Sequence, residues 1–454
     1  MLIRASLLSA PALQELRFEA DGGLVVDGQG SITDAGAFEA VAARHPGLVV
    51  EDLRPFWILP GLIDLHAHLP QYEAVAADGL ELLPWLEQHI FPAEARFADA
   101  LHASATARQY LKDALSLGTT TAVLYATIHA EATDAIFREA ESCGIRAVIG
   151  KTMMDRHAPE ALRENTETSL RESEELCRAW HGKDGGRLHY AFTPRFAPSC
   201  SRELMLGAGR LAQNYGAFIQ THLAENLQEL EWVRELFPEA ESYTDVYHRF
   251  GLLGPRTLLG HGVHLAPSER KVLRESGSHL VHCPSSNAFL QSGIMPLGAW
   301  LEEGLSVGLG TDVGAGPSLS MFREMGETCT ASKVKRAVQR VQSAHLTGMS
   351  GLTEDQKLQV AEALDLNPHP ALDAAGAFYM ATRGGARALG LGDRQGALAA
   401  GFDADFLVVD VRLSDPFGRA SADPVHVLSR LIYRTDPHLV QSAYVRGRRC
   451  FHRA

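Results

Sequence analysis

Eight short apolar segments alternate with stretches of helical character through the middle of the chain, and each apolar segment ends in polar, reactive residues. The segments are 62–68, 121–129, 147–155, 188–196, 218–225, 257–264, 279–287 and 306–313. Apolar strands separated by helices are typical of a parallel sheet whose outer face is covered. Because the set spans about 250 residues, we expect an α/β fold with a (β/α)8 TIM-type barrel, whose active site lies at the carboxyl ends of the strands.

The two ends of the chain have a different pattern, with short strand-like pieces broken by Gly, Pro and Asp. We expect these ends to form a small β-sandwich beside the barrel. The predicted division is 1–60 for the first part of the small domain, 61–395 for the barrel and 396–454 for the second part of the small domain. The first residues, MLIRASLLSAPALQ, are interpreted as a strand of the mature fold, since their apolar stretch is too short and too polar for a signal peptide.

Composition excludes several classes of function. The formal net charge is −13 and no basic cluster is present, so nucleic acid is not an expected partner. No run of eighteen apolar residues occurs, and we therefore expect no membrane-spanning helix. Six scattered cysteines without a CxxC pair are typical of free thiols in a reducing compartment, which predicts a cytoplasmic protein.

Two histidines at the end of the first segment begin a candidate metal site. His66 and His68 are two residues apart, so in a strand their side chains point to the same face. His222 follows the fifth strand and Asp312 follows the last one. Three imidazoles and one carboxylate suit a catalytic Zn²⁺ or Fe²⁺ that keeps an open position for water. We expect one metal ion per chain.

Further polar residues are predicted at the same mouth. Glu225 lies three residues after His222, where a carboxylate can move the proton of a metal-bound water. His261 is interpreted either as a fifth ligand or as a group beside the hydroxide, whereas the neighbouring His264 is given a structural role. Asp312 is preferred as a metal ligand or proton acceptor over the alternative of a helix N-cap.

Two other patterns are interpreted as unrelated to catalysis. Lys151 lies on the third strand, and a structural or ionic role is favoured over a carbamylated bridge between two metals. The run His129-Ala130-Glu131 matches half of a deaminase zinc motif, but the chain has no PCxxC to complete it.

Three residues predict a pocket for a planar, polar heterocycle. Gln71 comes five residues after His66 and offers both a donor and an acceptor. Arg195 ends the fourth strand with a fork of donors suited to a carbonyl oxygen or an anion. Phe196 provides a ring that can stack on a flat ligand. Taken singly, each residue is more typical of an ordinary role: a surface glutamine, a salt-bridged arginine and a core phenylalanine. Because all three are expected at the same barrel mouth, together they predict one pocket.

The motifs that carry these residues resemble the amidohydrolase superfamily and, within it, the guanine deaminase family. The chain contains, in the order of that family, PGLIDLHAHLPQ, LLPWLEQHIFPAEARFAD, YAFTPRFAPSCS, THLAEN, LGHGVHL, HCPSSNAFL and GLGTDVGAG. The resemblance covers roughly residues 56–410. It implies a homodimer and a zinc ion, with the following residues in the site: His66, His68, His222 and Asp312 as ligands, His261 near the water, Glu225 moving protons, and Gln71, Arg195 and Phe196 holding a purine.

The implied reaction is the hydrolysis of guanine to xanthine and ammonia, a step of guanine catabolism. Glu225 would protonate N3 of the purine, Arg195 would face O6, and hydroxide oriented by Asp312 and His261 would attack C2. One alternative is an aminohydrolase for another heterocycle, such as 8-oxoguanine, a pterin, an adenosine derivative or a triazine. An alternative of a different class is a non-catalytic scaffold with this fold.

Overall fold

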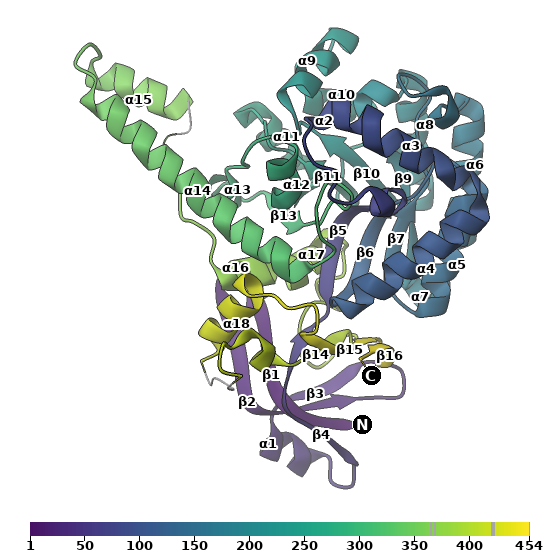
Figure 1. Ribbon diagram of the computed structural model, residues 1–454, viewed down its shortest axis with the longest axis vertical. Helices are drawn as coiled ribbons and strands as arrows, with labels where there is room; N and C mark the ends of the chain where they lie inside the picture. The colour runs from purple at the N-terminus through teal and green to yellow at the C-terminus, as the bar shows by residue number, and fades with distance from the viewer. Residues whose placement is uncertain (364–365, 367–368, 419–422, 454) are drawn as a thin grey trace.

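The computed structural model describes residues 1–363, 366, 369–418 and 423–453. Its larger part is a barrel of parallel strands that follow one another in chain order (Figure 1). These strands are β5 (Leu62–His68), β6 (Thr119–Tyr125), β7 (Arg146–Gly150), β9 (Leu188–Pro194), β10 (Phe218–Leu223), β11 (Thr257–His261), β12 (His279–His282) and β13 (Ser306–Leu309); the short β8 (Thr152–Met153) pairs with β9. The predicted α/β barrel is confirmed. Most predicted segments run past the strand ends, because their last, polar residues belong to the loops of the barrel mouth.

The residues that follow β13 close the barrel against β5. The backbone N–H of Thr311 donates to Oδ1 of Asp64 at 2.9 Å, and the Thr311 hydroxyl donates to Oδ2 at 2.6 Å. Asp64 is buried within β5. A buried carboxylate needs such donors to offset its lost hydration, so this contact fixes the register of the last strand against the first.

Helices cover the outer face of the barrel (Figure 1). They are α4 (Ala100–Ser116), α5 (Ala130–Cys143), α6 (Thr166–Trp180), α7 (Lys183–Gly186), α8 (Arg202–Tyr215), α9 (Leu227–Leu236), α10 (Tyr243–Arg249), α11 (Pro267–Ser276), α13 (Leu297–Glu302) and α16 (Ala374–Tyr379). Two short helices lie elsewhere: α12 (Pro284–Phe289) lies at the barrel mouth, and α17 (Gly385–Ala388) packs against β5 and β13. In α8 the Ser201 side chain caps the first turn by accepting from the N–H of Leu204, and the buried Leu204, Ala208 and Ala212 form the inward stripe.

A helical segment between β5 and α4 lies beside the barrel mouth. It contains α2 (Leu82–Trp85), a π-helical turn (Leu86–Ile90) and α3 (Phe91–Ala95). Its apolar side chains form a small core of their own with Leu290 and Ala315, which come from loops after β12 and β13. The segment therefore forms an apolar wall over the carboxyl ends of the strands.

Both ends of the chain meet in one mixed sheet of seven strands (Figure 1). Its order is β16 (Arg448–His452), β15 (Val440–Val445), β14 (Phe406–Val409), β4 (Val50–Pro60), β1 (Leu2–Ala12), β2 (Glu15–Val26) and β3 (Ile32–Ala37), with α1 (Phe38–Arg44) following β3. The predicted small β-domain thus consists of strands from both termini. These strands form a single hydrogen-bonded sheet, whereas a β-sandwich has two packed sheets. The boundaries at residues 60 and 395 stay a prediction.

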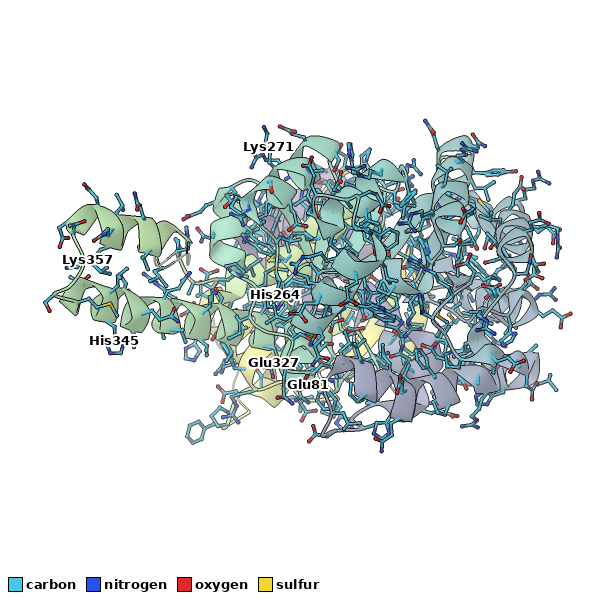
Figure 2. All side chains as sticks on the ribbon, turned by 90° about the horizontal axis from the view of Figure 1, so that it is seen from above. Glu81, His264, Lys271, Glu327, His345 and Lys357 are labelled. Atoms are coloured by element: carbon cyan, nitrogen blue, oxygen red, sulfur yellow. The ribbon has the colours of Figure 1, made fainter. Side chains whose placement is uncertain are left out.

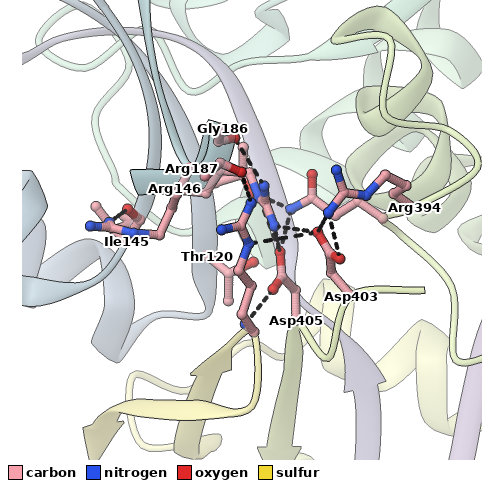
Figure 3. A network of polar contacts seen from close by, with 12 residues as sticks. Thr120, Ile145, Arg146, Gly186, Arg187, Arg394, Asp403 and Asp405 are labelled. Carbon is pink, nitrogen blue, oxygen red and sulfur yellow. Dashed lines mark hydrogen bonds and ion pairs between the residues drawn. The ribbon is translucent and has the colours of Figure 1, made fainter. Parts of the chain in front are cut away.

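A buried ionic network joins the barrel to the segment that returns to this sheet (Figure 3). Nη2 of Arg146, at the start of β7, lies 2.8 Å from Oδ2 of Asp403 and 3.0 Å from Oδ2 of Asp405. Gln395 donates to Asp405 as well, at 2.8 Å. All four side chains are buried. Paired charges of this kind hold the two parts in one relative position.

The helices α14 (Met321–Gly348) and α15 (Glu354–Ala363) project from the body as an arm (Figure 2), which carries His345 and Lys357 near its end. Val334, Val338 and Val341 are exposed along α14. The helix α18 (Pro424–Tyr433) packs against the base of α14. In the described part of the chain, no helix combines the length and the apolar character needed to span a bilayer.

Candidate active site

Histidines from β5 and β10 converge with Asp312 at the mouth of the barrel. Nε2 of His68 and Nε2 of His222 lie 3.0 Å apart. Oδ1 of Asp312 lies 3.3 Å from Nε2 of His66 and 3.4 Å from Nε2 of His68. The structure therefore brings together all four residues that the sequence pattern suggested as metal ligands.

The donor atoms of this cluster fit a metal ion. The nearest ligand atoms of His66, His222, His261 and Asp312 all lie within 4.8 Å of one another. Nε2 of His66 and Nε2 of His261 are buried, and neither has a hydrogen-bond partner among the described residues. A buried nitrogen without a partner costs free energy. An ion bound between these atoms would remove that cost, and the structure therefore contains a His/Asp metal-binding site.

Groups behind the ligands fix their orientation. Nδ1 of His222 lies 2.7 Å from the backbone oxygen of Arg195, and Nδ1 of His261 lies 2.9 Å from Oδ1 of Asn287. The hydroxyl of Ser286 donates to Oδ2 of Asp312 at 2.6 Å. Contacts of this kind set the tautomer and the ring angle of a ligating imidazole. Ser286 and Asn287 were missed by the sequence reasoning; their polar character immediately after β12 was the available signal.

Electrostatics favours neutral histidines beside a charged aspartate. Burial lowers the pKa of His66, and it lowers the pKa values of His68 and His222 further. Burial alone would raise the pKa of Asp312, but the close contact with His66 and the charge interaction with the neighbouring imidazoles outweigh burial and lower that pKa. Metals bind neutral imidazole and ionised carboxylate, so the cluster is in its ligating protonation state near neutral pH.

Glu225 and His261 form a titratable pair beside the cluster. Burial raises the pKa of Glu225 to about 7, against the opposing effect of His261. Burial would lower the pKa of His261, but the carboxylates of Glu225 and Asp312 raise it overall. Nε2 of His261 lies 3.4 Å from Oε2 of Glu225, whose Oε1 accepts from the Ser292 hydroxyl at 3.1 Å. Such a pair can take up and release a proton near neutral pH.

The backbone at three strand ends is held in an uncommon conformation. Ala224, His261 and Asp312 have φ values of 48°, 69° and 50°. Residues with a Cβ rarely adopt this left-handed region, and each instance costs on the order of 1–3 kcal/mol. The turn at Ala224 directs the neighbouring Glu225 to the mouth, and the other two turns direct His261 and Asp312 themselves.

A cavity opens onto the cluster. Gln71, Arg195 and Phe196 line it, together with Glu225 and His261. An apolar wall of the same cavity consists of Leu82, Trp85, Leu86, Leu290 and Ala315. All the residues predicted for the site therefore face one cavity or the metal cluster beside it.

A carboxylate that the sequence reasoning did not select, Glu94, contacts two of the lining residues. Its Oε1 accepts from Nε2 of Gln71 at 2.8 Å, and its Oε2 lies 2.7 Å from Nη1 of Arg195. Its only signal in the sequence was its place in the run FPAEARFAD.

The remaining candidates lie in other surroundings. Nε2 of His264 lies 2.7 Å from the backbone oxygen of Ser292. Lys151 is buried and forms an ion pair with Glu164. His129 directly precedes α5 on the outer face of the barrel.

A parallel barrel with a His/Asp metal site and a proton-moving pair at its mouth defines the class of metal-dependent hydrolases. The sequence model of the amidohydrolase family matches residues 57–450 of this chain. The chain is 39% identical over 397 residues to the guanine deaminase of Escherichia coli strain K12, covering 87% of this chain and 82% of that one. The chain therefore belongs to the amidohydrolase family and, within it, to the guanine deaminases.

Solved structures give the same family. The guanine deaminase of C. acetobutylicum, crystallised with guanine in its active site, superposes with a TM-score of 0.88 at 32% identity over 99% of each chain. An adenosine deaminase from Xanthomonas campestris with bound zinc superposes with a TM-score of 0.81 at 25% identity, over 99% of this chain and 92% of the other.

Proposed function

We propose that this enzyme hydrolyses guanine to xanthine and ammonia, a step of guanine catabolism. The observation that carries the proposal is the single cavity in which Gln71 and Arg195 face the metal cluster and the buried Glu225. The relative from C. acetobutylicum, which is similar over nearly the whole chain, binds guanine in its active site. Loss of metal ligands or of the proton-moving carboxylate would favour a non-catalytic scaffold, but this chain has all of them.

Zinc is the proposed cofactor, one ion per chain. His66, His68, His222 and Asp312 would hold it, since their nitrogen and oxygen donors suit Zn²⁺, and the related adenosine deaminase has zinc bound. Fe²⁺ accepts the same ligands. When bound, the ion supplies a nucleophilic hydroxide near neutral pH. Metal analysis of the purified protein distinguishes the two ions.

The side chains of the pocket position the purine and move its protons. Arg195 donates to O6 of guanine, and Gln71 donates to the ring edge beside it. Phe196 packs against the ring face. Glu225 accepts the proton of the attacking water and delivers it to N3, which makes C2 electrophilic.

His261, paired with Glu225 and Asp312, orients the water toward C2. The hydroxyl group now on C2 then gives its proton to Glu225, which passes it to the amino group as the C2–N bond breaks and the C2 carbonyl of xanthine forms. Guanine and water thus give xanthine and ammonia, and the enzyme regains its starting protonation.

The proposed assembly is a homodimer in the cytoplasm. The exposed Val334, Val338 and Val341 are spaced along α14 as one apolar stripe, which suits association of two copies. The six cysteines are all free thiols, as in a reducing compartment. Light scattering coupled to gel filtration measures the assembly directly.

The test of the function is conversion of guanine by zinc-replete protein, followed by ultraviolet absorbance and by ammonia release. The control is the Glu225→Gln variant, which keeps the shape of the side chain but cannot accept the proton. Unchanged guanine with the wild-type protein would overturn the proposal. A panel of 8-oxoguanine, a pterin, adenosine and a triazine, read by ammonia release, separates guanine from the other heterocycles.

A further inference from the structure

Glu94 lies immediately behind the two residues that are proposed to donate to the purine. It belongs to α3, and its side chain is only 6% exposed. It accepts from Nε2 of Gln71 at 2.8 Å, and Nη1 of Arg195 donates to both of its oxygens, at 2.8 and 2.7 Å. One buried carboxylate therefore holds both proposed purine-binding side chains.

The contacts of Gln71 fix which way its amide points. Its Nε2 donates to Glu94, and its Oε1 accepts from the backbone N–H of Gly314 at 3.3 Å. A carboxylate can only accept and a backbone N–H can only donate, so the reversed amide would lose both bonds. The second N–H of Nε2 stays available to a ligand.

Arg195 presents donors without a net charge. Its side chain is 5% exposed and is paired with the equally buried Glu94, so the two charges cancel inside the protein. Cζ of Arg195 also lies 5.7 Å from the ring centroid of Phe91, one helical turn before Glu94. An arginine that is paired with a carboxylate attracts an anionic ligand much less than an unpaired arginine does. Its remaining N–H groups still bind a neutral carbonyl oxygen.

We propose that Glu94 is a positioning residue that sets specificity: it orients the donors of Gln71 and Arg195 and cancels the charge of Arg195, so that the pocket selects a neutral lactam and releases an anionic product. This inference rests on the proposed function. Guanine is a neutral lactam near neutral pH. Its deamination product xanthine loses a ring proton close to neutral pH, so an unpaired Arg195 would retain it.

The experiment measures binding of xanthine and of hypoxanthine by calorimetry, slightly above neutral pH. There xanthine is largely anionic, whereas hypoxanthine is neutral and has the same O6 edge. Glu94→Gln removes the charge but keeps an acceptor. We expect it to shift the ratio of xanthine to hypoxanthine affinity toward xanthine by about tenfold, and to raise KM for guanine by about tenfold with a smaller change in kcat.

Glu94→Asp separates orientation from charge. It keeps the charge but withdraws the carboxylate by one methylene, so we expect a higher KM for guanine with an unchanged affinity ratio. Glu87→Gln is the matched control, since Glu87 is exposed in the same segment, and it should change neither quantity. A role in folding alone would lower the thermal midpoint without moving the ratio. An unmoved ratio in Glu94→Gln would therefore overturn the inference.

The pH dependence of ligand binding by the wild-type enzyme provides a second measurement. Its ratio of xanthine to hypoxanthine affinity should fall as the pH rises through the ionisation of xanthine; a rising ratio contradicts the inference. Glu225 also ionises in this pH range and repels anionic xanthine more than neutral hypoxanthine, so the effect of Glu94 is isolated by comparing the wild-type enzyme with Glu94→Gln at the same pH. Binding needs no turnover, so failure to deaminate guanine would overturn the proposed function and leave the ratio as a separate result.

Discussion

The backbone N–H of Asp312 donates to the carbonyl oxygen of His66 at 2.7 Å, and the side chains of the same two residues meet 3.3 Å apart. The first contact joins the end of the last barrel strand to the first strand. The second contact belongs to the metal cluster. Closure of the barrel and assembly of the metal site therefore depend on the same pair of residues, which links metal binding to stability.

Removal of the metal should lower the thermal midpoint of the enzyme as well as its activity. A ligand that binds only the folded state at a hundred times its Kd stabilises it by about 2.7 kcal/mol. Calorimetry of chelator-treated protein, with metal content measured on the same sample, checks this. Zinc added back should restore both properties; a metal-free sample with an unchanged midpoint would contradict the coupling.

Activity should rise with pH through about 7, because Glu225 must be ionised to accept the proton of water. Its pKa is raised to about 7 by burial. Below that pH the carboxyl is protonated and cannot accept, so kcat/KM should fall on the acid side. Glu225→Gln should lose about 10²–10⁴-fold in kcat. The exposed Glu231→Gln serves as the control, and a flat profile between pH values on either side of the pKa would count against this role.

Loss of the Asn287 amide should slow the reaction without unfolding the protein. Asn287→Ala removes the acceptor on Nδ1 of His261, so we expect a reduction of about 10–100-fold in activity. Asn287→Asp keeps an acceptor at the same place and should recover part of the loss. The two variants are compared by kcat at saturating guanine, and equal rates for both would exclude an orienting role.

Arg146→Met should destabilise the protein strongly while leaving the pocket intact. The substitution leaves the buried Asp403 and Asp405 without their main cation, a change that typically costs about 3–5 kcal/mol. Denaturant unfolding measures the loss. Arg171→Met, at an exposed ion pair on α6, is the control and should cost less than about 1 kcal/mol. A similar small cost at Arg146 would show that the network in Figure 3 contributes little.

Glu324→Gln should stabilise the protein at alkaline pH. Burial raises the pKa of Glu324 to about 8, although Ser285 donates to it. A raised folded-state pKa favours folding at low pH, and this contribution is lost as the pH rises from the ordinary glutamate value of about 4.3 to about 8. Glutamine does not ionise, so the gain in unfolding free energy of the variant over the wild-type protein should grow over that window, by up to about 5 kcal/mol. Urea unfolding of both proteins at about pH 4.3 and at about pH 8 tests this prediction. A stability difference that shrinks as the pH rises would contradict it.

Local patterns in the sequence predicted the strands of the barrel and most residues of the site. The strands of the barrel followed from apolar runs bounded by polar residues, because burial on both faces leaves that signature at each strand separately. His66 and His68 followed from the two-residue period of a strand. Positions at the ends of predicted strands suggested the other site residues, the family resemblance added their roles, and the structure places them around one cavity.

The tertiary structure alone decided how that cavity is supported. Glu94 lies 101 residues before Arg195 in the chain, and Asp64 lies 247 residues before Thr311, so no periodicity links either pair. The single seven-stranded sheet was likewise decided by pairing of β4 with β14, from opposite ends of the chain. The sequence by itself determined which segments become strands and which residue types end them. The contacts between distant segments determined the orientation and charge of the pocket, because hydrogen bonds and ion pairs depend on distances that only the folded chain sets.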